Sequence, residues 1–319
     1  MYNIIVGGQI HHSGIELLRS IDNFNVSVLS DASQETLNKN IHDADAILLR
    51  LQSFSKSLID QCPKLKILSR NGVGYDRIDI PELTKRKIPL TIVGDVNSSS
   101  VAEHTIMLIL DLLKSTRQHD QMVRSENWKD RDLLISNDFE NKRILIIGFG
   151  RIGQKVAKIA DAFGAKILVF DPYIKTKNNL PLRYQIIDKL DPGLKQADII
   201  TLHAPGTTEP IINKREISLM KKNAIIINTS RGSHIDLDAL YRAIEEKHIK
   251  AAGLDVYPIE PPNIKEEGIF KLENSLFTPH IAGMSYDCAS RMALNSAQNI
   301  IDALNGSLKS EYVVNKEVL

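Results

Sequence analysis

The chain has only two cysteines among its 319 residues, Cys62 and Cys288, which lie far apart and outside any Cys-x-x-Cys pattern. This spacing favours neither a disulfide framework nor a zinc knuckle, so we expect no metal site and a reducing compartment. Apolar runs of membrane-spanning length are also missing, and the first residues lack the basic and apolar regions of a signal peptide. We therefore expect a cytoplasmic protein with no membrane partner.

Neither sign of charge predominates, because 40 lysines and arginines balance 39 aspartates and glutamates and leave a formal net charge of +1. No block of like charge stands out, which argues against a nucleic-acid partner. Apolar residues make up 43% and charged residues 25% of the chain, as is usual for folded proteins. The length exceeds what one hydrophobic core usually supports, so we expect two domains.

Short apolar runs alternate with helical patterns along the chain, which predicts α/β units with parallel sheets. The first series of expected strands covers residues 4–6, 26–29, 46–49, 67–69 and 90–93. The second series covers residues 144–147, 166–170, 198–202, 224–228, 251–254 and 275–278. We expect one long helix over 99–124 between the two series, and a helix over 290–304 that packs back onto the first unit.

A glycine-rich segment directly follows the expected strand 144–147. Gly148, Gly150 and Gly153 form the pattern Gly-x-Gly-x-x-Gly, and the sequence continues as a helix to residue 163. In this context the first glycine permits a tight turn, the second lets the backbone approach a pyrophosphate, and the third allows close packing of helix and strand. The N-terminus of the helix adds N–H groups and positive potential. Because strand and helix flank the glycines, the pattern predicts a dinucleotide site rather than simple turn punctuation.

Asp171 follows the next expected strand, 18 positions after Gly153 (171 − 153). A carboxylate there accepts hydrogen bonds from the ribose hydroxyls of adenosine and repels a 2′-phosphate. The alternative is an aspartate that merely caps a strand. Together with the glycines, Asp171 favours NAD over NADP.

Three polar residues stand at the ends of later expected strands, where ligands of open α/β sheets bind. They are Arg231 in Thr-Ser-Arg-Gly, Glu260 in Ile-Glu-Pro and His280 in Thr-Pro-His. These segments closely resemble those of the D-isomer-specific 2-hydroxyacid dehydrogenase family. Blocks 71–76, 101–105, the glycine segment and 202–205 resemble the same family in order, so the resemblance covers nearly the whole chain.

The resemblance implies two Rossmann-like or flavodoxin-like lobes, with an NAD-binding lobe inserted into a discontinuous substrate-binding lobe. We place the breaks near Asn97 and Ser285, which gives a substrate domain of residues 1–97 plus 286–319 and an NAD domain of residues 98–285. It also implies a catalytic trio. Arg231 would hold the substrate carboxylate bidentately, His280 would donate or accept the proton, and Glu260 would tune His280 and fix which of its ring nitrogens faces the substrate.

Further positions carry over from the family. Those expected to line the cofactor are Gly148, Gly150, Arg151, Ile152, Gly153, Asp171, His203, Pro205, Thr229, Ser230, Asp255, Ala282 and Gly283. Those expected to meet the substrate are Arg50, Ser53, Val73 and Gly74. Glu103 and His104 open a helix that the resemblance places at the interface of a homodimer, although such residues are also common in a first helical turn.

The substrate is less defined than the class of reaction. Leu51 and Gln52 depart from the small polar residues often found there in the family, and Ser233-His234 is less usual after Arg-Gly. Arg50 would bind a phosphate or second carboxylate, or would form a surface ion pair. If Arg50 binds a phosphate or second carboxylate, the phosphoglycerate and hydroxypyruvate (glycerate) members of the family are favoured. No segment resembles an appended regulatory domain, so we expect a short form.

Two other functions share this fold. One is an NAD(H)-sensing binding protein of the corepressor type, which would bind the dinucleotide without turnover. The other is formate dehydrogenase, whose pattern has glutamine where Glu260 stands, so Glu260 argues against it. We expect an NAD-dependent oxidoreductase.

Overall fold

The computed structural model describes residues 1–174 and 181–319. It comprises two compact units, of which unit 1 is Met1–Asn97 with Gly283–Leu319 and unit 2 is Ser98–Ala282. The chain passes from unit 1 to unit 2 between Asn97 and Ser98 and returns between Ala282 and Gly283, where the sequence led us to place breaks near Asn97 and Ser285. Within the described ranges, no helix combines the length and apolar character needed to cross a membrane.

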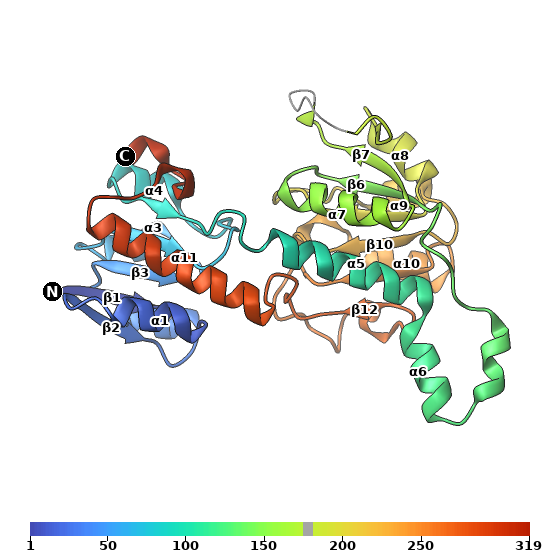
Figure 1. Ribbon diagram of the computed structural model, residues 1–319, viewed down its shortest axis with the longest axis horizontal. Helices are drawn as coiled ribbons and strands as arrows, with labels where there is room; N and C mark the ends of the chain where they lie inside the picture. The colour runs from blue at the N-terminus through green and yellow to red at the C-terminus, as the bar shows by residue number, and fades with distance from the viewer. Residues whose placement is uncertain (175–180) are drawn as a thin grey trace. The chain divides into compact units, whose positions relative to one another are not determined.

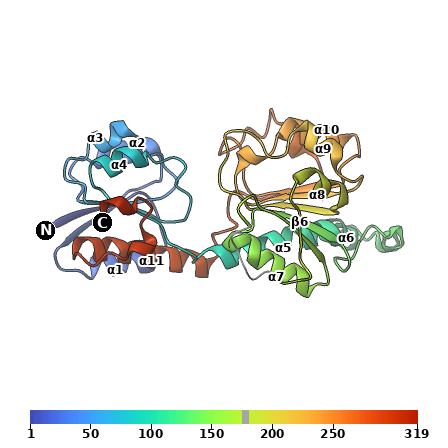
Figure 2. The same cartoon turned by 90° about the horizontal axis from the view of Figure 1, so that it is seen from above.

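Unit 1 is built on a five-stranded parallel sheet in the order β2-β1-β3-β4-β5. Its strands are β1 (Tyr2–Val6), β2 (Phe24–Val28), β3 (Ala46–Leu49), β4 (Ile67–Arg70) and β5 (Leu90–Thr91). One face is covered by α1 (His12–Arg19) and α11 (Tyr286–Leu304), and the other by α2 (Gln34–Asn40), α3 (Lys56–Asp60) and α4 (Ile80–Lys85) (Figure 2).

The C-terminal part of the chain completes unit 1. On α11, Ala297, Ile300 and Ile301 pack with apolar residues of β1, β3 and β4. Beyond the helix, the buried Asn315 side chain accepts a hydrogen bond from the Leu90 N–H at 2.8 Å and donates one to the Ile88 carbonyl at 2.9 Å. These bonds hold the final segment against β5, and they make the C-terminal residues part of the unit 1 core.

Unit 2 is built on a seven-stranded parallel sheet in the order β12-β11-β10-β9-β6-β7-β8. The strands are β6 (Arg143–Ile147), β7 (Lys166–Phe170), β8 (Gln185–Ile186), β9 (Ile199–Leu202), β10 (Ile225–Asn228), β11 (Ala251–Leu254) and β12 (Leu276–Phe277). Helices α5 (Ser98–Lys114) and α7 (Arg151–Ala162) cover one face, while α8 (Leu190–Gln196), α9 (Lys214–Leu219) and α10 (Leu237–Glu245) cover the other (Figure 2). The strand order reverses between β6 and β9, which is where such sheets bind dinucleotides.

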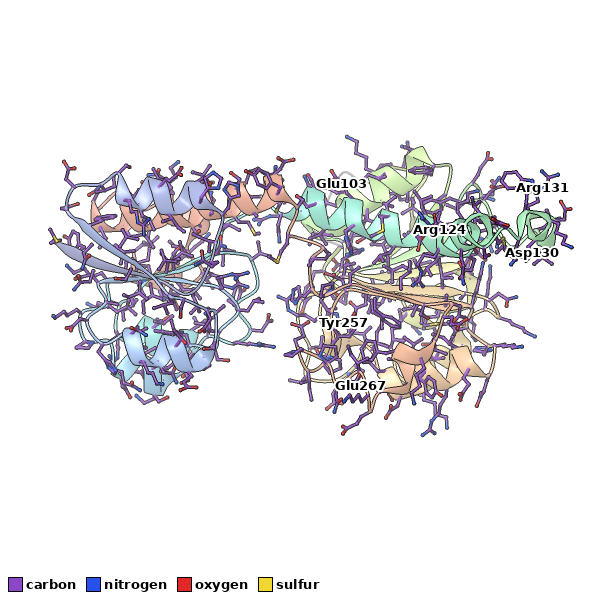
Figure 3. All side chains as sticks on the ribbon, turned by 90° about the horizontal axis from the view of Figure 1, so that it is seen from below. Glu103, Arg124, Asp130, Arg131, Tyr257 and Glu267 are labelled. Carbon is purple, nitrogen blue, oxygen red and sulfur yellow. The ribbon has the colours of Figure 1, made fainter. Side chains whose placement is uncertain are left out.

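The predicted α/β class with two parallel sheets is confirmed, but the single long helix over 99–124 is wrong. The backbone of Ser115 adopts a left-handed conformation with φ of 52°, which ends α5 and starts α6 (Thr116–Arg124) in a new direction. With the 3-10 helix η1 (Trp128–Leu133), α6 forms an arm that extends away from the sheet (Figure 1), and Arg124, Asp130 and Arg131 lie along it (Figure 3). The short strand β8 was not predicted either.

Candidate active site

The turn between β6 and α7 has the shape of a dinucleotide cradle. Gly148 has φ of 91°, and a β-carbon there would lie 2.6 Å from the backbone of His203. A β-carbon on Gly153 would lie 2.2 Å from the carbonyl oxygen of Gly148. At Gly150, the N-cap of α7, a β-carbon would meet no atom within 4 Å. Two glycines are therefore required by packing, and the third leaves open space at a helix N-terminus, as a pyrophosphate needs.

Asp171 directly follows β7 and reaches back to the glycine turn. Its Oδ2 accepts a hydrogen bond from the Phe149 N–H at 2.8 Å, and its Oδ1 accepts one from the Tyr173 N–H at 2.8 Å. Each carboxylate oxygen accepts more than one hydrogen bond, so these contacts orient the group without exhausting it. Arg151 and Ile152 form the start of α7. The residues of this region fit NAD.

His203 follows β9 and packs beside Gly148. Its Nε2 lies 2.9 Å from the Thr201 hydroxyl oxygen, and its buried Nδ1 has no hydrogen-bond partner within residues 1–174 and 181–319. Burial lowers the pKa of His203 to about 3, so the ring is neutral at physiological pH. An orphaned buried nitrogen beside the glycine turn also fits a polar ligand at this place.

The turn after β10 carries Arg231. The Asn228 amide donates a hydrogen bond to the Arg231 carbonyl at 2.8 Å, and the Arg231 guanidinium donates one to the Ser230 carbonyl at 2.7 Å. The hydroxyl oxygens of Thr229 and Thr105 lie 2.9 Å apart, which links the turn to α5. Arg231 is therefore held by its backbone and its side chain at the carboxyl end of a central strand.

His280 and Glu260 form a direct pair. The Nδ1 of His280 lies 2.9 Å from the Oε2 of Glu260, whose Oε1 accepts a hydrogen bond from the Tyr257 N–H at 3.2 Å. The His280 side chain is 37% exposed and that of Glu260 is 21% exposed, so a proton on this histidine is accessible. Tyr257, labelled in Figure 3, is buried, and its ring packs against that of Phe270. Its hydroxyl donates a hydrogen bond to the Thr278 carbonyl at 3.0 Å.

The buried Asp255 organises the loop that carries His280. One carboxylate oxygen accepts hydrogen bonds from the Thr278 hydroxyl at 2.5 Å and the Ile281 N–H at 2.9 Å, and the other accepts one from the Ala282 N–H at 2.9 Å. These bonds hold His280 in a left-handed conformation with φ of 55°. Asp255 stays a predicted cofactor residue, and no sequence pattern predicts its contacts with this loop.

His104 is tied into the same network within unit 2. Its Nε2 lies 3.0 Å from the Thr278 hydroxyl oxygen and 3.7 Å from the Asp255 carboxylate. Burial lowers the pKa of His104, and the charge of Asp255 opposes that effect. Its neighbour Glu103 is exposed on α5 (Figure 3).

In unit 1, Arg50 follows β3 and is half-buried. Burial lowers the pKa of Arg50, and the structure gives its guanidinium no ion-pair partner among the described residues. Next to it, the buried Gln52 accepts a hydrogen bond from the Arg50 N–H at 3.0 Å and donates one to the Gly7 carbonyl at 2.6 Å. The Ser53 N–H donates to the Gln34 side chain at 2.9 Å, so the backbone of Ser53 is tied to α2.

The loop after β4 contains Val73 and Gly74. The Arg70 guanidinium donates hydrogen bonds to the carbonyls of Gly74, at 3.0 Å, and Asn71, at 2.5 Å. Within residues 1–174 and 181–319, the backbone N–H groups of Val73 and Gly74 donate no hydrogen bond. Arg70 shapes this loop, and no sequence pattern predicts that role. Gly283, expected at the cofactor, belongs to unit 1.

A parallel α/β unit with a dinucleotide turn and a histidine–glutamate pair at its strand ends defines a nicotinamide-dependent oxidoreductase. Residues 106–282 match the family model described as D-isomer specific 2-hydroxyacid dehydrogenase, NAD binding domain. The chain belongs to this family and is an NAD-dependent dehydrogenase.

Individual relatives agree with this assignment. The chain is 36% identical to a D-3-phosphoglycerate dehydrogenase of Methanocaldococcus jannaschii, covering 99% of this chain but only 60% of the relative. It is 34% identical to a glyoxylate reductase of Thermococcus litoralis, covering 99% of this chain and 97% of that protein. The solved structure of D-lactate dehydrogenase from Aquifex aeolicus, complexed with NAD and lactic acid, has a TM-score of 0.88 at 27% identity, with 98% and 99% of the two chains covered.

Proposed function

We propose that this chain interconverts a small D-2-hydroxy acid and its 2-keto acid, of the phosphoglycerate or hydroxypyruvate (glycerate) type. The observation that carries the proposal is the 2.9 Å pair between His280 and Glu260, held in place by Asp255. Arg231 follows β10, which is the neighbour of β11 in the sheet, and Glu260 and His280 follow β11 and β12. Both cysteines are free thiols, which supports a cytoplasmic setting.

Each residue of the trio has one chemical task. Arg231 presents a planar fork of donors that binds a carboxylate bidentately and polarises the adjacent carbonyl. His280 gives a proton to the carbonyl oxygen in reduction and removes one from the hydroxyl in oxidation. Glu260 occupies Nδ1 of His280, so Nε2 is the nitrogen left to meet the substrate. Bound NADH supplies the hydride that the carbonyl carbon accepts.

The cofactor would be held by the glycine turn, Asp171 and the loops after β9 and β10. Gly150 leaves the space for the pyrophosphate, and Asp171 accepts from the adenosine ribose. We also assign His203, Pro205, Thr229, Ser230, Ala282 and Gly283 to the cofactor site. These assignments favour NAD over NADP because Asp171 repels a 2′-phosphate.

For the substrate, we propose that Arg50 binds an anionic group at C3, while the N–H groups of Val73 and Gly74 bind the carboxylate. A half-buried guanidinium with no ion-pair partner in the described ranges is stabilised when an anion arrives. The relatives named D-3-phosphoglycerate dehydrogenase and glyoxylate reductase differ in this group, because glyoxylate has no C3. Ser53 is the remaining proposed substrate contact.

The first experiment follows NADH oxidation with 3-phosphohydroxypyruvate, hydroxypyruvate, glyoxylate, pyruvate and 2-ketoglutarate. We expect His280→Ala to lower kcat by about a hundredfold or more, and Arg231→Ala to abolish detectable turnover. The exposed Arg242→Ala on α10 is the matched control and should behave as wild type. Tight NADH binding without turnover of any acid would replace the proposal with the NAD(H)-sensing function.

A second experiment identifies the substrate group. Arg50→Gln should raise KM for 3-phosphohydroxypyruvate by about tenfold or more, because a charge-assisted hydrogen bond is lost. KM for glyoxylate should stay unchanged, and the exposed Arg19→Gln should alter neither value. Equal changes for the two acids would remove Arg50 from the substrate site.

We also propose that the protein is a homodimer joined through the arm of α6 and η1. Val123, Trp128, Leu133 and Leu134 expose between 60% and 85% of their surface there, which is unusual for large apolar side chains on a projecting segment. A second copy would cover them. Sedimentation should show a dimer for the wild type and a monomer for Trp128→Ser with Leu134→Ser, and a monomeric wild type would contradict the proposal. Glu103 is exposed on α5 and available to such an interface.

A further inference from the structure

His234 is a histidine at a place where the sequence pattern is unusual for the family. It ends the 3-10 helix η3 (Gly232–His234), three residues after Arg231, and its side chain is fully buried. Leaving a ring nitrogen of a buried imidazole unpaired costs about 1–3 kcal/mol, and both ring nitrogens of His234 are paired. The partners of His234 therefore show what the residue does.

The two ring nitrogens bind two different loops. The Nε2 of His234 lies 2.8 Å from the carbonyl oxygen of Pro205, in the loop after β9. A carbonyl only accepts, so Nε2 carries a proton and donates it. The Nδ1 lies 2.9 Å from the hydroxyl oxygen of Ser230, in the turn after β10. One ring thus joins the loop that we assign to the cofactor with the turn that carries Arg231.

The connection continues to the backbone of Arg231. The Ser230 N–H donates to the Oδ1 of Asn228 at 3.1 Å, and the Asn228 amide donates to the Arg231 carbonyl at 2.8 Å. The His234 N–H donates to the same carbonyl at 3.1 Å. The Arg231 carbonyl therefore accepts from two donors, the amide of Asn228, which is bonded to Ser230, and the backbone N–H of His234.

We propose that His234 is a positioning residue that couples cofactor binding to the placement of Arg231. This inference rests on the proposed function, since it takes Arg231 as the carboxylate anchor and the Pro205 loop as part of the NAD site. A dinucleotide that orders the loop after β9 also orders the Arg231 turn through the imidazole. An apolar side chain of similar volume fills the same space without this link.

Two conservative substitutions separate the two halves of the link. The amide nitrogen of glutamine takes the place of Nε2, so His234→Gln keeps the bond to Pro205 and loses the one to Ser230. The amide of asparagine takes the place of Nδ1, so His234→Asn keeps the bond to Ser230 and loses the one to Pro205. His234→Leu loses both.

The readouts are Kd for NADH, measured by titration without substrate, and KM for the keto acid at saturating NADH. We expect both variants to raise KM by about tenfold, because the loss of either buried hydrogen bond breaks the link to the Arg231 turn. Only His234→Asn should also raise Kd by about tenfold, because only this variant loses the bond to Pro205. His234→Leu should raise both. The control His248→Gln changes a half-buried histidine that contacts the Ile217 carbonyl at 3.2 Å, and it should leave both values unchanged.

A KM that rises in His234→Gln but not in His234→Asn, or no change in either variant, would overturn the coupling. The titration of NADH needs no turnover. If the wild type reduces no keto acid, the proposed function fails, but the Kd of the Asn and Gln variants still tests the Pro205 half of the link. The two failures are therefore distinguishable.

Discussion

Gly232 and Tyr257 touch backbone to backbone: a β-carbon built on Gly232 would lie 1.9 Å from the carbonyl carbon of Tyr257. Gly232 directly follows Arg231, and Tyr257 lies three residues before Glu260. The segment that carries the proposed carboxylate anchor and the segment that carries the partner of His280 are thus packed with no room for a side chain. Their spacing depends on this glycine.

Gly232→Ala should therefore separate the two segments. We expect a loss of about 3 kcal/mol in the free energy of unfolding, because overpacking against backbone atoms cannot be relieved by a rotamer change. Activity should fall further than this loss explains, since Arg231 moves relative to Glu260. Chemical denaturation and kcat/KM measure the two effects, and a variant of wild-type stability and activity would refute the contact.

Gly150→Ala, at the N-cap of α7 in the same unit, should affect cofactor binding and leave stability unchanged. The methyl group meets no protein atom within 4 Å, so the melting temperature without cofactor should stay close to that of the wild type. Kd for NADH should rise by about tenfold or more, because the methyl group occupies the space that the pyrophosphate needs. An unchanged Kd would mean that the cofactor does not approach this turn.

Asp255→Asn should loosen the loop that carries His280. The amide offers an N–H group where one carboxylate oxygen now accepts from Ala282 or from Ile281 and Thr278, so at least one buried donor loses its partner at a cost of about 2 kcal/mol. We expect lower thermal stability and a reduced kcat. Thr278→Val removes only the hydroxyl contacts with Asp255 and His104 and keeps the bonds of Asp255 to the loop backbone. Its effects should be smaller, and larger effects in that variant would contradict the role given to Asp255.

His203 should make the protein less stable in acid. Its pKa is about 3 in the folded chain against an ordinary value of 6.5, so below pH 6.5 the unfolded chain takes up a proton that the folded chain does not. The contribution to stability is complete above the ordinary pKa and falls as the pH drops towards the folded value, reaching about 2 kcal/mol of loss near pH 5.

His203→Gln should flatten this dependence in denaturation curves recorded across the acid range. The exposed His12→Gln is the control and should follow the wild type. Parallel curves for wild type and His203→Gln would show that another group causes the acid loss.

The sequence predicts where most strands lie along the chain, because their apolar runs are short and are separated by helical patterns. It does not predict the break in the helix 99–124, since nothing in the residues around Ser115 requires a left-handed backbone there. Strand β8 has only two residues, both exposed, so it has no hydrophobic pattern to detect.

The candidate site also contains residues that the sequence predicts and contacts that it does not. Gly148, Gly150 and Gly153 are predictable because each position requires a residue without a side chain. The first forms the tight turn, the second lets a pyrophosphate approach the backbone, and the third lets helix and strand pack closely. The contacts of Arg70 with Gly74, of Asp255 with Ala282 and of His234 with Pro205 join residues that are distant in sequence or that bind through backbone atoms. Such contacts correspond to no fixed residue spacing, so no sequence pattern predicts them.

The two-part composition of unit 1 affects the order in which the chain folds. Strands β1 to β5 are synthesised first, but the helix α11 that covers one face of their sheet, and Asn315 that binds β5, are synthesised after the whole of unit 2. On the ribosome, unit 2 is therefore the first part to have all of its core residues available. Until α11 is made, α1 alone covers that face of the N-terminal sheet, so part of its apolar surface stays exposed on the nascent chain and is open to misassociation.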